Sequence, residues 1–289
     1  MARTTLEDVA WWIAQLEMGR TQQGEFDGPA FLRPHHFVVL ACEVHRRRAT
    51  AVTIPQPLQG YAARMRLWQS IGLTCPMQVN ERNPGGRFRP LTPISSEATA
   101  QALADDITEV FNVCGTEDKK TLGAINVTLS EIFSNCFFHA EACDGEARIC
   151  GLACAQSWPH EQLAQVAVAD IGIGIRASLG ANPAYVSRLA QENANAVATE
   201  LGVTGKPQGR HSGYGLALAR QLMEKHDGNL LIVSGTEAFR ATAHGVEMKQ
   251  LSSPWAGTIV VLEWDMARPF DILSVYSEWP SDEESDELI

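Results

Sequence analysis

The chain has 289 residues, of which 45% are hydrophobic and 20% are charged. This composition is typical of one large or two ordinary globular domains and excludes wholesale disorder. No apolar run approaches the roughly 18 residues of a membrane helix, and the first residues lack the apolar core of a secretory signal. We therefore expect a cytoplasmic protein without a membrane partner, whose seven cysteines are reduced thiols.

The net charge of −11 is divided unevenly along the chain. Residues 1–95 carry a net charge of +4, and residues 96–289 carry −15. The asymmetry predicts two units with different surfaces. It also argues against direct nucleic-acid binding, which needs a net basic face.

Three helices are predicted in the first unit, over 9–16, 34–48 and 58–72, with a short β-prone run at 51–54. A segment rich in Pro, Gly, Asn and Arg follows, and we expect a domain boundary there, after residue 92.

The second unit, 93–266, begins with helical patterns and continues with strands. Helices are predicted over about 95–113, 118–142, 184–201 and 214–225, and strands over 147–155, 163–169, 229–234, 246–251 and 258–264. This order predicts an α+β layer sandwich. Residues 267–289 are predicted to form an acidic tail that is solvated or paired with a basic surface.

Three polar side chains share one face of the helix predicted over 118–142. Glu131, Asn135 and His139 are four residues apart, and each step of four turns the position by only about 40°. A carboxylate one turn before a carboxamide suits phosphoryl chemistry, because the amide oxygen can ligate Mg²⁺ and the carboxylate can orient a nucleophile. The alternative is an ordinary polar stripe.

Two glycine-containing segments come later in the chain, the first directly after a predicted strand and the second at the start of a predicted helix. Asp170 ends a strand and is followed by Gly172 and Gly174, a pattern that lets the backbone turn tightly against a flat ligand. The segment 209–216 opens the helix predicted over 214–225, where free backbone amides bind phosphate well. The alternatives are a capped turn and a flexible loop.

These motifs occur in the order in which the GHKL ATPase superfamily carries them, and the chain resembles that superfamily over roughly 95–266. The matching segments are LSEIFSNCFFHAEA, DIGIGI, GRHSGYGLALARQLMEKHDGNLLIVSG and the closing strand GTIVVLEW. The resemblance implies a two-layer sandwich of a mixed β-sheet and helices, with ATP and Mg²⁺ as cofactors.

The resemblance also implies roles at the phosphate end of the ligand. Asn135 would ligate Mg²⁺, Glu131 would activate water or an acceptor hydroxyl, and His139 would lie near the phosphates. Residues 176–212 would form a lid, from which Lys206 would approach a phosphate. Backbone amides at the end of the lid would meet the phosphates, and the positions concerned are Gly213, Tyr214, Gly215 and Leu216.

At the base end, Asp170 resembles the adenine-reading aspartate, and Thr258 resembles the threonine that supports it. Gly172 and Gly174 would shape the adenine pocket. Position 171 is Ile, where many superfamily members have Asn, so the polar contacts that such an Asn provides are in doubt.

Residues 25–75 resemble a STAS-type module, an α/β unit in which a strand leads to a loop and a helix. The loop of that family often carries a phosphoacceptor serine, but this chain has Pro34, His35 and His36 there. A serine switch is therefore in doubt, and the two histidines are interpreted as caps or linings of a helix start. An unrelated small α/β cap is the alternative.

These observations favour an ATP-binding regulatory protein that acts on a protein partner by hydrolysing ATP or by transferring phosphate. A conventional sensor kinase is disfavoured, because 95–113 is too short for a helical hairpin and holds no histidine. A Ser/Thr kinase of anti-sigma type, a nucleotide-dependent scaffold without turnover and a homodimer stay open. A metal or redox centre is disfavoured by the spacing of Cys136, Cys143, Cys150 and Cys154.

Overall fold

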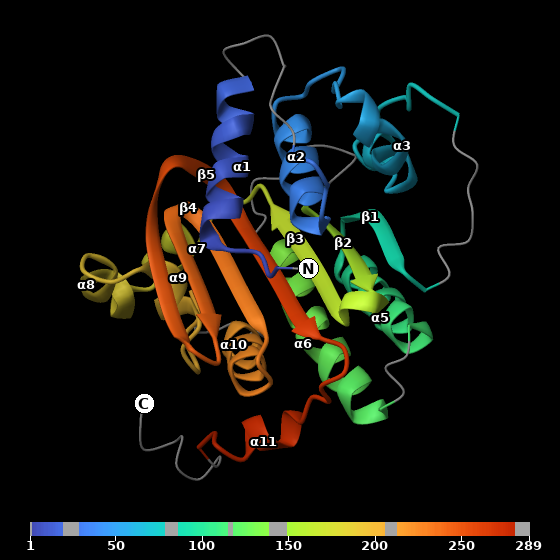
Figure 1. The fold of residues 1–289 in the computed structure, drawn as a ribbon. Coiled ribbons are helices and arrows are strands. Elements are labelled where there is room, and N and C mark those ends of the chain that lie inside the picture. Colours follow the sequence, from blue (N-terminus) through green and yellow to red (C-terminus); the bar gives the residue numbers. More distant parts are fainter. Residues whose placement is uncertain are drawn as a thin grey trace.

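A computed structural model describes residues 2–19, 29–78, 86–114, 118–138, 149–205 and 213–280. Within these residues, five strands form one sheet in the order β1-β2-β3-β5-β4 (Figure 1). The strands are β1 (Phe88–Ile94), β2 (Gly151–Trp158), β3 (Leu163–Asp170), β4 (Asn229–Thr242) and β5 (Gly245–Asp265). All described pairings are antiparallel.

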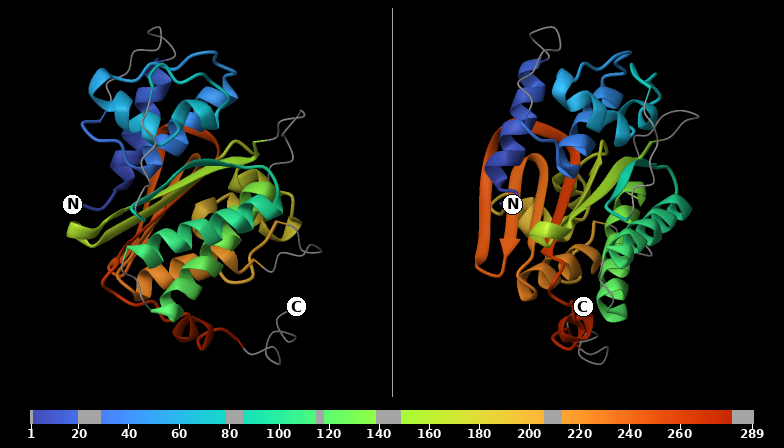
Figure 2. Two further views of the ribbon diagram at one scale, coloured as in Figure 1. Left: turned by 90° about the vertical axis from the view of Figure 1, so that its right-hand side faces the viewer. Right: turned by 45° about the vertical axis from the view of Figure 1, so that its right-hand side comes forward.

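Helices cover both faces of this sheet, as the edge-on view in Figure 2 shows. One face carries α5 (Glu97–Val113), α6 (Lys119–Phe138) and α10 (Gly215–Lys225), with the short helices α7 (Ile175–Gly180), α8 (Val186–Leu189) and α9 (Ala194–Ala198) beside them. The other face carries α1 (Leu6–Gly19), α2 (Pro34–Arg46), α3 (Gln56–Arg64) and α4 (Leu67–Ser70). In the described part of the chain, no helix is both long and apolar enough to cross a membrane.

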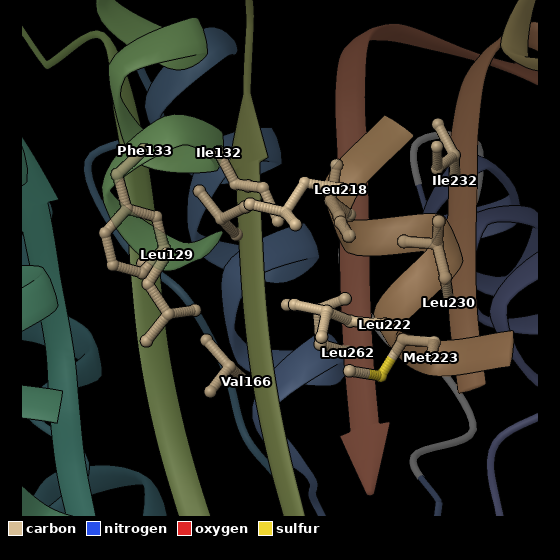
Figure 3. Close-up of a cluster of buried hydrophobic side chains, with 14 of the residues drawn as sticks. Leu129, Ile132, Phe133, Val166, Leu218, Leu222, Met223, Leu230, Ile232 and Leu262 are labelled. Carbon is tan, nitrogen blue, oxygen red and sulfur yellow. The ribbon is translucent and has the colours of Figure 1, made fainter. Parts of the chain in front are cut away.

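The strands contribute alternate residues to two hydrophobic cores, because successive side chains of a strand point to opposite faces. On β5, Val260 and Leu262 face α6 and α10, whereas Ile259 and Val261 face α1 and α2. Figure 3 shows the first core, in which side chains of α6 and α10 meet over β3, β4 and β5. This packing sets α6 and α10 side by side, which positions the site described below.

The predicted α+β sandwich is confirmed, with differences in detail. The described sheet is antiparallel throughout rather than mixed, and the two strands predicted at 246–251 and 258–264 are one continuous strand, β5. Strand β1 was not predicted. It contains Pro90 and Pro93, and proline is confined to the edges of sheets; β1 is an edge strand.

The N-terminal residues differ more from the expectation. The strand predicted at 51–54 is wrong: these residues are unpaired, and the described residues before Phe88 hold helices only. The strand expected of a STAS-like module is therefore absent from the described residues. The predicted boundary after residue 92 falls inside β1, and α1 and α2 share a core with the sheet. The cap predicted at the start of α2 is confirmed, since Arg33 N donates to His36 Nδ1 (2.9 Å).

A buried carboxylate fastens the N-terminal segment to the sheet. Glu263 of β5 has no exposed surface, and its Oε2 accepts hydrogen bonds from Thr4 N (2.8 Å) and Asn229 Nδ2 (2.8 Å). Its Oε1 accepts from Thr4 Oγ1 (2.7 Å) and Gln165 Nε2 (2.6 Å). The Glu263 carboxylate thus accepts four hydrogen bonds, and these compensate for the desolvation of its charge.

We expect Glu263→Gln to lower the free energy of unfolding by about 2–4 kcal/mol, because an amide nitrogen would then face hydrogen-bond donors. The matched control is Glu247→Gln on the same strand, whose exposed carboxylate pairs with Arg240 across 3.5 Å and should change stability by less than about 1 kcal/mol. Denaturant unfolding of both variants measures the difference. Equal effects would mean that the buried network adds little to stability.

Residues 267–289 were expected to be solvated or paired with a basic surface, but several side chains after β5 pack against the core instead. Phe270 and Val275 are buried in the core shared by α6 and α10, and Trp279 packs against the same core. The short helix α11 (Ile272–Tyr276) lies at one end of α6 and α10 (Figure 1). Residues 281–289, which hold five of the seven acidic residues of the predicted tail, lie outside the described residues.

Candidate functional site

A pocket of about 870 Å³, counting the solvent space at its open mouth, lies between α6, the end of β3, the middle of β5, α7 and the start of α10. Nine residues that the sequence motifs single out line it, namely Glu131, Asn135, Asp170, Gly174, Gly213, Tyr214, Gly215, Leu216 and Thr258. The fold thus gathers one cavity from four segments that are far apart in the sequence.

Asp170 is the most deeply buried polar residue of this pocket, with 7% of its surface exposed. Its Oδ1 accepts hydrogen bonds from Gly172 N (2.8 Å) and Thr258 N (3.2 Å), and the Thr258 side chain adds another. Gly172 is not among the lining residues, so its part in the described structure is to hold the carboxylate. The orientation of Asp170 is therefore fixed before any ligand enters.

The backbone crowds Asp170 from the neighbouring strand. Gly257 has φ +102, and a Cβ there would collide with the carbonyl oxygen and carboxylate of Asp170. Ser234 links Gly257 to the turn that follows Asp170. Its Oγ donates to Gly257 O (2.8 Å) and accepts from Ile175 N (2.9 Å). Only glycine fits at position 257, where β3 and β5 meet the pocket.

Burial raises the pKa of Asp170 to about 7, against the hydrogen bonds from Gly172 and Thr258, which lower it. The surroundings give the reason: the thiols of Cys42 and Cys136 are buried near it, and their own pKa values are raised, first by burial and then by the Asp170 charge. A carboxylate that is costly to ionise is a group that gains from a hydrogen-bond donor on a ligand.

At the opposite end of the pocket, α6 and α10 approach each other closely. A Cβ on Gly215 would lie 2.9 Å from Glu131 Cβ, so a larger residue would push the helices apart. Glu131 is exposed to the pocket and Asn135 is half-buried one turn later. The first amides of α10 have no acceptor within the helix, so they can donate to an anion.

The remaining predicted residues are placed differently. His139 and Lys206 lie outside the described residues, as does Arg210 of the glycine-containing loop. Ile171 packs, partly buried, against the core of the N-terminal helices, which explains an apolar residue at this position. Among the described lining residues none is Lys or Arg.

Eleven further residues line the pocket, six of them in the predicted lid 176–212, and the sequence motifs gave none of them an individual role. The additional lining residues are Ile132, Cys136, Val168, Ile175, Ser178, Leu179, Ala198, Val203, Thr204, Gly205 and Val260. Periodicity could have found some of them. Val168 precedes Asp170 by two residues and Val260 follows Thr258 by two, so each shares a face of its strand with the polar residue. Cys136 lies one turn after Ile132.

Three of the four cysteines whose spacing was considered lie in the described residues, and they form no disulfide with one another. Cys136, Cys150 and Cys154 are buried, and Cys143 lies outside the described residues. In the described ranges, no group of three or more His, Cys, Asp or Glu side chains is arranged to hold a metal ion.

The pocket thus offers a buried carboxylate that can accept hydrogen bonds at one end and helix amides that can bind an anion at the other. The family model described as histidine kinase-like ATPase domain matches residues 94–230, which supports the GHKL superfamily. A search of curated proteins found no match.

Proposed function

We propose that the protein binds Mg·ATP in this pocket and uses it as a cytoplasmic regulatory switch for a protein partner. The buried carboxylate of Asp170 is the observation that carries the proposal. It lies among apolar side chains such as Val168 and Val260 and is oriented by Gly172 and Thr258. A planar base with an exocyclic amine fits these walls and supplies a further donor to the carboxylate.

The opposite end of the pocket fits a triphosphate with its metal ion. Asn135 offers an oxygen ligand that suits Mg²⁺, and the first turn of α10 offers amides for phosphate oxygens. Bound Mg·ATP would supply the phosphoryl group, and its Mg²⁺ would neutralise part of the phosphate charge in a pocket whose described lining holds no basic side chain. Glu131 is positioned to orient a nucleophile and to accept its proton.

Either water or a hydroxyl of a partner protein could be that nucleophile. The presence of Glu131 in the pocket favours turnover over a scaffold that only binds nucleotide. Incubation of the full chain with ATP labelled in its terminal phosphate, with Mg²⁺, separates the outcomes. Free phosphate supports an ATPase, label on protein supports a kinase of anti-sigma type, and bound but intact ATP supports the scaffold. Absence of any nucleotide binding would refute the proposal.

A partner that senses the nucleotide should bind in one state only. We expect a pull-down with the full chain to retain a protein in the presence of a non-hydrolysable ATP analogue and Mg²⁺ but not with ADP, or the reverse. Retention that is equal in both states would argue against a switch.

The proposal predicts a pH dependence for nucleotide binding. The pKa of Asp170 is raised to about 7, and an amine donor needs the ionised form. The affinity for adenosine should therefore fall as pH decreases below 7, by about tenfold per unit, and level off above it. Binding measured between pH 5.5 and 8.5 tests this.

The raised pKa of Asp170 has the opposite effect on the stability of the fold: ionisation favours binding of the ligand but disfavours folding. Because the pKa is higher in the folded than in the unfolded chain, ionisation of Asp170 destabilises the empty protein above pH 7, and this cost is relieved as pH falls toward about 4. An affinity that does not change with pH across this window would contradict the role given to Asp170.

A further inference from the structure

The chain after β5 packs back across the ends of α6 and α10, and we call residues 265–280 the C-terminal strap (Figure 1). The backbone N–H of the buried Phe270 donates to Thr121 Oγ1 of α6 (2.8 Å). Asp271 N donates to His226 Nε2 at the end of α10 (3.2 Å). The strap is therefore attached to both helices that line the phosphate end of the pocket.

Trp279 is the part of the strap that reaches the start of α10. Its ring centroid lies 5.1 Å from that of Tyr214 and 5.0 Å from that of Tyr276. Its Nε1 donates to Gln221 Oε1 of α10 (2.6 Å). The indole is thus fixed by a hydrogen bond and in turn supports Tyr214, the residue at the N-cap of α10.

Tyr214 connects the strap to the pocket. It is a lining residue, and the next residue, Gly215, lies against Glu131. Tyr276 of α11 lies on the same side. Burial is the main cause that raises its pKa, and the charge of Glu131 raises it further, which places the two residues near each other. The aromatic group of Tyr214, Tyr276 and Trp279 therefore borders the two features proposed to act on phosphate, the first turn of α10 and Glu131.

We propose that Trp279 is a positioning residue for the phosphate end of the nucleotide site, holding Tyr214 and the first turn of α10 in place beside Glu131. The inference rests on the proposed function, but Trp279 lies outside residues 94–230, which the family model matches. Amides that bind phosphate act best when they are oriented beforehand, and an aromatic pair supplies such orientation. Binding at the base end should not depend on Trp279, because Gly172 and Thr258 hold Asp170 in place without it.

The test compares two ligands on the full chain, a non-hydrolysable ATP analogue with Mg²⁺ and adenosine. We expect Trp279→Ala to weaken binding of the analogue about three- to tenfold and to leave adenosine unchanged. Trp279→Phe keeps the ring and should restore most of the affinity. The matched control is Leu273→Ala, in the same strap but 63% exposed, which should bind both ligands as the wild type does.

A second measurement needs no nucleotide. Hydrogen exchange of the amides of 218–221, which begin with the Leu218 N–H that donates to Tyr214 O, should quicken in Trp279→Ala and stay unchanged in Leu273→Ala. Unchanged analogue binding and exchange in Trp279→Ala would overturn the positioning role, and so would an equal loss for adenosine and the analogue. If the wild type binds neither ligand, the proposed function fails, and the role of Trp279 toward phosphate fails with it. If the wild type binds both ligands, the result for Trp279→Ala tests the positioning role alone.

Discussion

Asp170→Asn is expected to weaken the binding of adenine nucleotides about 100-fold while leaving the protein folded. The replacement is isosteric, and its amide oxygen can keep the hydrogen bonds from Gly172 N and Thr258 N that Oδ1 accepts now. The amide nitrogen would then meet the exocyclic amine of the base, so that two donors face each other. Calorimetric titration with adenosine and with an ATP analogue measures the loss.

Asp170→Asn also has expected effects on stability, on the pH dependence of binding and on the preference for the base, and these serve as controls. Burial raises the pKa of Asp170, so the neutral amide should leave the empty protein at least as stable at pH 8. The pH dependence of binding should disappear, and the relative preference for a base with a carbonyl in place of the amine should rise. Wild-type affinity in Asp170→Asn would mean that the base is not recognised by this carboxylate.

Glu131→Gln is expected to lower nucleotide turnover about 10²- to 10⁴-fold, because the amide cannot accept a proton from the nucleophile. Binding should stay within about threefold of the wild type, since glutamine fills the same space beside Gly215. Steady-state phosphate release and analogue binding, measured on the same preparation, separate the two effects.

The control for this variant is Glu109→Gln, at an exposed carboxylate of α5 that accepts a hydrogen bond from Asn112. Turnover in that variant should equal that of the wild type. If Glu131→Gln retains full activity, another group accepts the proton. If the wild type itself releases no phosphate, the scaffold alternative gains support.

The arrangement of the pocket followed from local patterns. The spacing of Glu131 and Asn135 placed both on one side of α6, and Asp170 with its glycines marked the end of a buried strand. The nine motif residues meet in one cavity because α6 and α10 pack side by side on the sheet. Which helix face meets which partner is a tertiary property, and here the family resemblance supplied it.

The second helical layer was not predicted, although β5 carried a signal for it. Residues 259–262 are apolar without alternation, which is typical of a strand that is buried on both faces. Composition at 80–93 suggested a boundary instead, because the prolines of β1 conceal an edge strand.

The packing of the C-terminal strap was missed for a different reason. The acidic residues that follow the strap in the sequence predicted a solvated tail, and the few apolar side chains that anchor the strap have no repeating pattern. Phe270 and Val275 become buried only because α6 and α10 form a surface to receive them. Such contacts between segments far apart in the sequence have no local signature.

The central claim is that the pocket selects an adenine nucleotide through Asp170. The most direct measurement is equilibrium binding of ATP and GTP, each with Mg²⁺, to the full chain at pH 8, with Asp170→Asn in parallel. We predict one saturable site for ATP with a dissociation constant below about 1 mM, in the range of enzyme substrates, and much weaker binding of GTP. The variant should lose ATP binding. Absence of ATP binding, or equal affinity for both nucleotides in the wild type, would contradict the account.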